Sequence, residues 1–159
     1  MPPAPPPPAP PPPSCLECEI VAGRVRPPGG VLWRRDGLVV HAVAAPTPVR
    51  GWLVIAPERH VRAVYDLDDA ETARLATLAR RLMRLQREVL GAAHAYQVAI
   101  GEVLHHAHVH VIPRYDDTPE RLRGPRVFLA EPGDALPERE AEAAATELAR
   151  ALAVDGHRG

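Results

Sequence analysis

The stretch HHAHVHVIPR, residues 105–114, places a histidine at every second position of a short apolar segment. Successive side chains of a β-strand point to opposite faces, so His106, His108 and His110 are expected on one face. The apolar residues between and after them occupy the other face. The pattern predicts a strand with one face for chemistry and one face for a hydrophobic core.

The segments on either side indicate further strands. AYQVAI, residues 95–100, is expected to pair with the histidine strand across Gly101 and Glu102, and Pro113 is expected to end that strand. VLWRRDGLVVHAV, residues 31–43, predicts a β-hairpin that turns at Asp36-Gly37. GWLVIAP, residues 51–57, is a nearly continuous apolar run, typical of a central strand.

Two segments predict helices. Between residues 66 and 90, leucines recur at three- and four-residue steps, with acids in the first turn and Gly91 just beyond the end. Residues 137–154 are rich in Ala, Glu and Arg but have a thin apolar stripe, so we expect a helix that packs loosely. The element order predicts an α+β fold with a mostly antiparallel five-stranded sheet, one long helix and a C-terminal helix.

Length and composition favour one domain. The chain has 159 residues, is 46% hydrophobic and carries a formal net charge of -1, which argues against nucleic acid as a partner. No apolar run is long enough to span a bilayer and no signal peptide is recognisable, so we expect no membrane and a cytoplasmic protein. We divide the chain into a disordered proline-rich tail (1–13), a catalytic domain (14–116) and a C-terminal loop and helical extension (117–159).

The candidates for chemistry are few. The sequence contains no lysine and Ser14 is its only serine, so no internal Ser or Lys nucleophile exists. The histidine strand by itself allows three interpretations: a polar surface patch, a metal site, or nucleophilic catalysis by one imidazole. Cys15 and Cys18 have the C-x2-C spacing of metal or redox chemistry.

Four ordered blocks resemble the histidine triad (HIT) family, in particular its zinc-binding C-x2-C bacterial type and its diadenosine polyphosphate hydrolases. The blocks are CLECEIVAG, the hairpin that follows with Pro27 and Asp36, GWLVIAPERHV, and IGEVLHHAHVHVIPR. Together they cover residues 15–115, and the triad followed by Ile-Pro-Arg is the most specific of them. The resemblance implies a HIT-like fold.

The resemblance also implies an activity. The family acts on nucleotides whose α-phosphate carries a leaving group, such as dinucleoside polyphosphates, nucleoside phosphoramidates or aminoacyl adenylates. His108 would be the nucleophile, within a catalytic triad completed by His106 and His110, and His110 would hydrogen-bond the non-bridging phosphate oxygens. Gly101, Glu102 and Arg114 would lie near the phosphates.

A cofactor and an assembly follow from the same resemblance. Cys15, Cys18, His60 and His106 match the ligands of a structural Cys2His2 zinc site. Two free thiols are the alternative. Family members are commonly homodimers, so we expect a homodimer in which the long helix and a neighbouring strand make the contacts.

Two positions depart from the family pattern. Trp52 stands where the family has a histidine that supports the triad, and Glu102 replaces a glutamine that helps to protonate the leaving group. Glu102 would need burial to act as a general acid. The alternatives are therefore a nucleotide-binding regulatory protein with little catalysis, or an enzyme in which all three histidines bind a catalytic metal. His41 and His105 are expected at the surface or in loops.

Overall fold

The computed structural model describes residues 15–44 and 46–155. The proline-rich segment expected to be a disordered tail lies outside the described residues. The helices are α1 (Leu16–Val21), α2 (Asp69–Leu90) and α3 (Glu138–Asp155), and the strands are β1 (Val31–Arg35), β2 (Leu38–Ala42), β3 (Leu53–Pro57), β4 (His94–Val98) and β5 (Val109–Arg114).

The strands form one five-stranded sheet in the order β1-β2-β3-β5-β4, and every neighbouring pair is antiparallel. The predicted fold class is confirmed, with β3 at the centre of the sheet. The β1-β2 hairpin turns at Asp36 and Gly37, both with positive φ, as a tight hairpin turn requires. The sheet thus brings β3 and β5, which are far apart in sequence, side by side.

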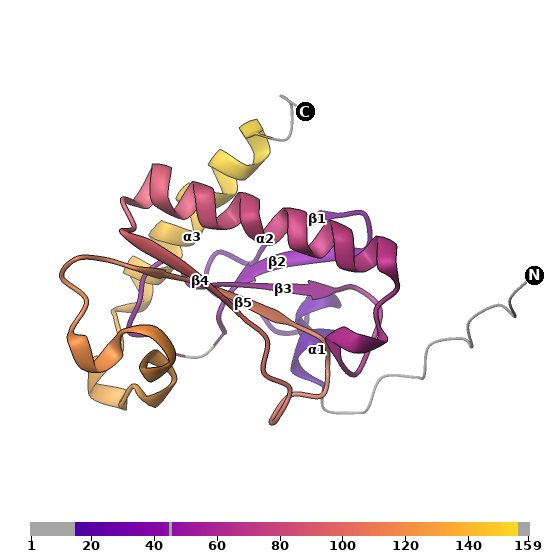
Figure 1. Ribbon diagram of the computed structural model, residues 1–159, viewed down its shortest axis with the longest axis horizontal. Helices are drawn as coiled ribbons and strands as arrows, with labels where there is room; N and C mark the ends of the chain where they lie inside the picture. Colours follow the sequence, from indigo (N-terminus) through magenta and orange to yellow (C-terminus); the bar gives the residue numbers. More distant parts are fainter. Residues whose placement is uncertain (1–14, 45, 156–159) are drawn as a thin grey trace, which may run out of the picture.

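Helix α2 covers one face of the sheet (Figure 1). A capping box between Asp68 and Glu71 begins it, and Gly91 in the left-handed conformation ends it. Its apolar side packs on the side chains of β2, β3 and β5 that point towards it, among them Val40, Ile55 and Val111. Helix α1 and the histidines lie on the opposite side of the sheet.

Strand β5 begins later than the sequence predicts. The ladder starts at Val109, so His106 and His108 precede the strand instead of lying on it, and residues 99–108 form the connection from β4. The reason is that the Ala107 N–H donates to the carbonyl of Val61 at 2.6 Å, outside the sheet ladder. Pro113 does not end the strand. It lies inside β5 and pairs with Ala95 of β4, beyond the last residue of β5 that pairs with β3.

Helix α3 packs more firmly than its thin apolar stripe predicts. Leu148 and Leu152 are both 1% exposed, and α3 lies against α2, β1 and β2. Small alanines beside these leucines, such as Ala145, let the helix approach closely, so a narrow stripe is enough to join the common core. Among the described residues, no helix has the length and apolar character needed to cross a membrane.

Candidate active site and metal centre

A row of side chains crosses the sheet face opposite α2. His41 of β2 pairs with Val54 of β3, which pairs with His110 of β5. Directly paired residues of neighbouring strands share a face, so His41 and His110 both point to the side that carries α1. His41 is 1% exposed, which corrects the expectation of a surface or loop histidine.

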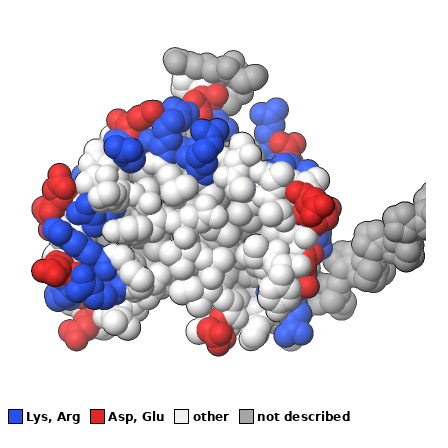
Figure 2. Space-filling model, in the orientation of Figure 1, with Lys and Arg blue, Asp and Glu red and all other residues white. Residues whose placement is uncertain are grey.

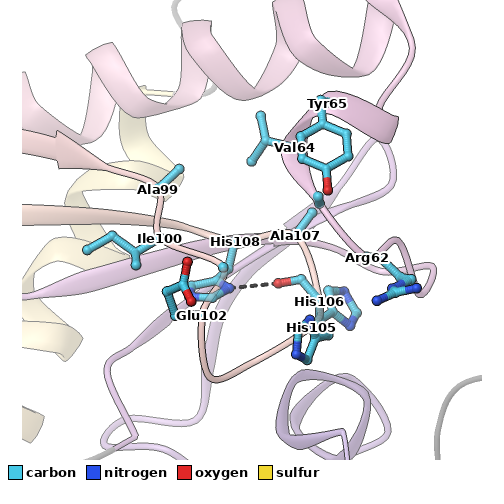
Figure 3. A pocket seen from close by; sticks show the side chains of 12 residues that line it. Arg62, Val64, Tyr65, Ala99, Ile100, Glu102, His105, His106, Ala107 and His108 are labelled. Carbon is cyan, nitrogen blue, oxygen red and sulfur yellow. Dashed lines mark hydrogen bonds between the residues drawn. The ribbon is translucent and has the colours of Figure 1, made fainter.

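His108 is held by its own main chain. Its Nδ1–H donates to the carbonyl oxygen of His106 at 2.7 Å (Figure 3), so the lone pair of the neutral ring is on Nε2. No hydrogen-bond partner of Nε2 is found within the described part of the chain. A neutral imidazole fixed in this tautomer has the form that a nitrogen nucleophile needs.

His110 lies beside His108, with ring centroids 4.9 Å apart. The indole Nε1–H of Trp52 donates to Nδ1 of His110 at 3.1 Å. Burial lowers the pKa of His110 to about 4, and the neighbouring His108 acts in the same direction. Trp52, the first departure from the family pattern, therefore contacts the triad directly.

Phe128 belongs to the same cluster, although it was not among the site residues expected from the sequence. It lies in a 3-10 helix, Gly124–Leu129, and meets Trp52 and His110 edge-on at centroid distances of 5.2 and 5.5 Å. The ring is 37% exposed, so it forms part of the wall beside the histidines. The segment after β5 thus folds back onto the site of its own chain.

A second cluster consists of four side chains that can each offer a ligand atom to a metal ion. The ligand atoms of Cys15, Cys18, His60 and His106 all lie within 4.8 Å of one another. Nδ1 of His106 is 3.3 Å from Sγ of Cys15 and 3.6 Å from Sγ of Cys18, and Nδ1 of His60 is 3.4 Å from Sγ of Cys18. Helix α1 supplies Cys18, and Cys15 is the residue directly before it.

These residues fit zinc. Bond lengths of about 2.3 Å to sulfur and about 2.05 Å to nitrogen place tetrahedral S and N ligands about 3.6 Å apart. The three S···N distances, 3.3 to 3.6 Å, are close to that value. Nε2–H of His106 donates to the carbonyl of Pro57 at 2.9 Å, which leaves Nδ1 free as the ligand atom. The structure thus brings together the four residues that the family resemblance implies as zinc ligands.

The alternative of a three-histidine catalytic metal lacks support in the geometry. His106 turns its free nitrogen to the cysteines, while Nδ1 of His108 and Nδ1 of His110 are each used in a hydrogen bond. Within residues 15–44 and 46–155, the only group of donors close enough to hold an ion is the Cys2His2 cluster. The ring of His106 is therefore placed to hold a metal ion together with the cysteines, and its carbonyl accepts the Nδ1–H of His108.

A groove of about 410 Å³ borders His108. Figure 3 shows Ile100 on one side of it and Tyr65 on the other, with Arg62 at one end. Gly101, Glu102 and His105 also line the groove, and Glu102 and His105 are exposed. The burial that a general-acid role for Glu102 would require is thus not present, whereas the expected loop position of His105 is observed.

Arg114 lies at the far end of β5, opposite His94 of β4. With a rise of about 3.3 Å per residue, it is roughly 13 Å along the strand from His110. Its guanidinium donates to the carbonyl of Tyr115 at 3.3 Å. The structure thus gathers the three histidines, Gly101 and Glu102 in one region and places Arg114 away from them.

A buried pair beneath the sheet face was also not anticipated. Nε2 of His41 lies 2.9 Å from a carboxylate oxygen of Glu17, and Nδ1–H of His41 donates to the carbonyl of Ala42 at 2.8 Å. Burial opposes ionisation of Glu17, but the hydrogen bond and charge of His41 outweigh it and hold the pKa of Glu17 below its ordinary value. Glu17 lies between Cys15 and Cys18, so the pair connects the candidate metal-binding segment to β2.

Charged side chains surround the face seen in Figure 2 and leave its centre free of charge. Acids accompany the arginines, as in the pairs of Arg84 with Asp155 and of Arg121 with Asp134. Charges of both signs thus surround an uncharged centre on this face.

The comparisons with known proteins agree with this geometry. The model of the HIT domain matches residues 31–117, more than half of the chain. The chain belongs to the HIT domain family. Two curated relatives, the AP-4-A phosphorylases of Mycobacterium tuberculosis strains CDC 1551 and H37Rv, are each 32% identical over 87 residues, covering 50% of this chain and 44% of the relative. The chain thus spans less than half the length of these relatives.

Solved structures share the fold. A zinc-bound histidine triad family protein from Mycobacterium smegmatis matches with a TM-score of 0.71 at 21% identity, over 92% of this chain and 98% of that chain. A hypothetical histidine triad nucleotide-binding protein from Sulfolobus tokodaii matches with a TM-score of 0.69 at 16% identity, over 88% and 93% of the two chains. At these identities the likeness concerns the fold.

Proposed function

We propose that the protein is a nucleotide hydrolase or nucleotidyl transferase that acts at the α-phosphate of dinucleoside polyphosphates or nucleoside phosphoramidates, through a covalent nucleotidyl-histidine intermediate. The observation that carries the proposal is the hydrogen bond from Nδ1–H of His108 to the carbonyl of His106, which leaves Nε2 of a neutral ring available for attack. Family membership and the 32% identical AP-4-A phosphorylases support the same substrate class.

The reaction divides one displacement into two. Nε2 of His108 attacks the α-phosphorus, the bond from phosphorus to the leaving group breaks, and the leaving group takes the electron pair. The positive charge on the ring of His108 is stabilised by the carbonyl of His106, which accepts its Nδ1–H. Water, or another acceptor, then attacks phosphorus and releases His108.

Neighbouring residues stabilise the phosphate and the site. His110 donates its Nε2–H to a non-bridging oxygen, where negative charge develops. Gly101 and Glu102 line the groove that takes the leaving group, and Arg114 meets only the distal part of a long polyphosphate. Bound to Cys15, Cys18, His60 and His106, zinc would supply structural cross-linking and no chemistry at phosphorus.

The proposal includes a homodimer in the cytoplasm. Strand β4 lies at the edge of the sheet beside α2, so its outer backbone groups are open to a second copy. A reducing compartment keeps the two cysteines available as metal ligands. Sedimentation equilibrium tests the dimer, and a monomer at micromolar concentration contradicts it.

The decisive experiment is intact-protein mass spectrometry after brief mixing with a diadenosine polyphosphate or with an adenosine phosphoramidate. We expect a nucleotidyl adduct on the wild type that survives base and is lost in acid, and no adduct on His108→Ala. His94→Ala, an exposed histidine of β4, serves as the matched control and should react like the wild type. Unchanged turnover in His108→Ala would overturn the proposal.

Trp52 and the exposed Glu102 favour one second candidate, a nucleotide-binding regulatory protein with little catalysis. That candidate predicts tight nucleotide binding by isothermal titration calorimetry, without adduct or released mononucleotide from either compound. The same mass-spectrometric experiment therefore separates the two functions.

A further inference from the structure

Trp52 determines which nitrogen of His110 carries the proton. An indole N–H can only donate a hydrogen bond, and it donates to Nδ1 of His110 at 3.1 Å. Nδ1 must therefore be the acceptor, so the proton of the neutral ring is on Nε2. No partner from the described residues reaches this Nε2–H, which leaves it available to a ligand.

The indole is held in place on several sides. Trp52 is 7% exposed, and its carbonyl accepts the Val43 N–H at 3.0 Å. The preceding Gly51 has φ +77, a conformation that favours glycine, and its carbonyl accepts a hydrogen bond from the buried side-chain amide of Gln86 at 2.9 Å. Phe128 meets the indole edge-on. These contacts oppose rotation of the donor away from His110.

The contact also limits where a proton can come from. A histidine at position 52 could accept a proton and pass one on, whereas an indole does neither. Burial lowers the pKa of His110 to about 4, so its ring is neutral near pH 7. Apart from His106 and His108, the titratable side chains that line the groove are Arg62, Tyr65, Glu102 and His105, and all four are exposed to solvent.

We propose that Trp52 is a positioning residue that holds His110 as a neutral Nε2–H donor, and that the site therefore prefers leaving groups that depart as anions over amines that must gain a proton. This inference rests on the proposed function. It selects phosphoanhydrides, such as dinucleoside polyphosphates, within the wider substrate class.

The preference follows from the balance of the displacement. With a phosphoanhydride, the N–P bond to His108 forms, the P–O bond breaks, and the departing phosphate keeps the electron pair as an anion that is stable at pH 7. With a phosphoramidate, the P–N bond breaks and the departing nitrogen must take a proton. Neither Trp52 nor neutral His110 supplies that proton, because the proton on Nε2 of His110 is needed to bind the phosphate.

The tautomer can be measured without any substrate. Two-bond proton-nitrogen correlation spectra of protein carrying 15N-histidine distinguish the Nε2–H from the Nδ1–H tautomer. We expect His110 to show the Nε2–H pattern alone near pH 7, and Trp52→Phe to add the second tautomer. Trp33→Phe, in β1, should leave the His110 signals unchanged, since Trp33 pairs with Val40 and therefore faces α2, on the other side of the sheet from His110. A charged or Nδ1–H His110 in the wild type overturns the proposal.

The leaving-group preference is measured on the same proteins. We expect the wild type to cleave a diadenosine polyphosphate at least ten-fold faster than an adenosine phosphoramidate, and Trp52→Phe to lower kcat roughly three- to ten-fold with little change in KM. Trp52→His should lower the ratio of these two cleavage rates, because a histidine at position 52 could pass on a proton. Equal rates on both compounds in the wild type overturn the proposal, although an adduct on His108 would still support the wider function. Absence of any adduct contradicts the wider function, whatever the tautomer of His110.

Discussion

The carbonyl oxygen of His106 accepts the Nδ1–H of His108 at 2.7 Å, while the ring of the same His106 points into the Cys2His2 cluster. One residue therefore connects the candidate metal-binding side chains to the candidate nucleophile. A displacement of the His106 main chain would move both the ring and the carbonyl that fixes the tautomer and direction of His108. The metal cluster is expected to control the geometry of catalysis without contacting substrate.

Zinc binding is the first prediction. Metal analysis should find about one zinc per chain, as one tetrahedral site implies, and Cys18→Ser should lose it. Burial, together with the adjacent Cys15, raises the pKa of the Cys18 thiol to about 12 in the absence of metal, so zinc uptake by metal-free protein should release its proton at pH 7. Because His106 orients His108, we expect kcat of Cys18→Ser to fall about ten-fold or more.

The control for the zinc prediction is restoration of the chelator-treated protein by added zinc. Wild type treated with a strong chelator should regain its activity and thermal midpoint on addition of zinc, whereas Cys18→Ser should regain neither. Zinc-free purified protein that shows no proton release on addition of zinc would contradict the assignment.

The buried pair of Glu17 and His41 is expected to stabilise the fold. Glu17→Gln leaves a buried imidazole without its carboxylate, so the free energy of unfolding should fall by roughly 3 kcal/mol in urea titrations. Glu19→Gln, two residues further along α1, removes an exposed pair with Arg24 and should cost less than about 1 kcal/mol. Equal effects of the two substitutions on the free energy of unfolding would contradict a larger contribution from the buried pair.

Helix α3 is predicted to be part of the same cooperative unit as the sheet. Leu148→Ala creates a cavity in the shared core and should lower the free energy of unfolding by about 2–5 kcal/mol. Val154→Ala, at a position that is 58% exposed, is the matched control and should change it by less than about 0.5 kcal/mol. A separate low-temperature transition for α3 would instead support an independent extension after residue 116.

Acid should weaken the fold through His110. Burial lowers the pKa of His110 from the ordinary 6.5 of histidine to about 4 in the folded protein, so between these pH values the unfolded chain binds more protons. The contribution of His110 to the free energy of unfolding is therefore fully present above the pKa of the unfolded state. It decreases as the pH is lowered from there, by up to about 3 kcal/mol in total. His110→Gln should flatten the decline measured by urea titration between pH 7 and 4. The substitution His94→Gln, at an exposed position, should leave the decline unchanged. An equal decline in the wild type, His110→Gln and His94→Gln would contradict the role of His110.

The sequence by itself determined the sheet, the long helix and the identity of the chemical groups. The nearly continuous apolar run of residues 51–57, the three- and four-residue steps along α2 and the Asp36-Gly37 turn are local patterns, and local backbone preferences decide them. The resemblance to the family implied the four candidate metal donors, Cys15, Cys18, His60 and His106, and the structure brings their ligand atoms within 4.8 Å of one another.

The tertiary structure decided the contacts between segments distant in the chain. The start of β5 depends on the bond from Ala107 to Val61, and the firm packing of α3 depends on a core shared with α2. His41 is buried because Glu17 of α1 lies against it. Phe128 contacts Trp52, although the two residues are far apart in the chain. The physical reason is that a hydrogen-bond partner or a packing neighbour is chosen by proximity in space, which no local period in the sequence encodes.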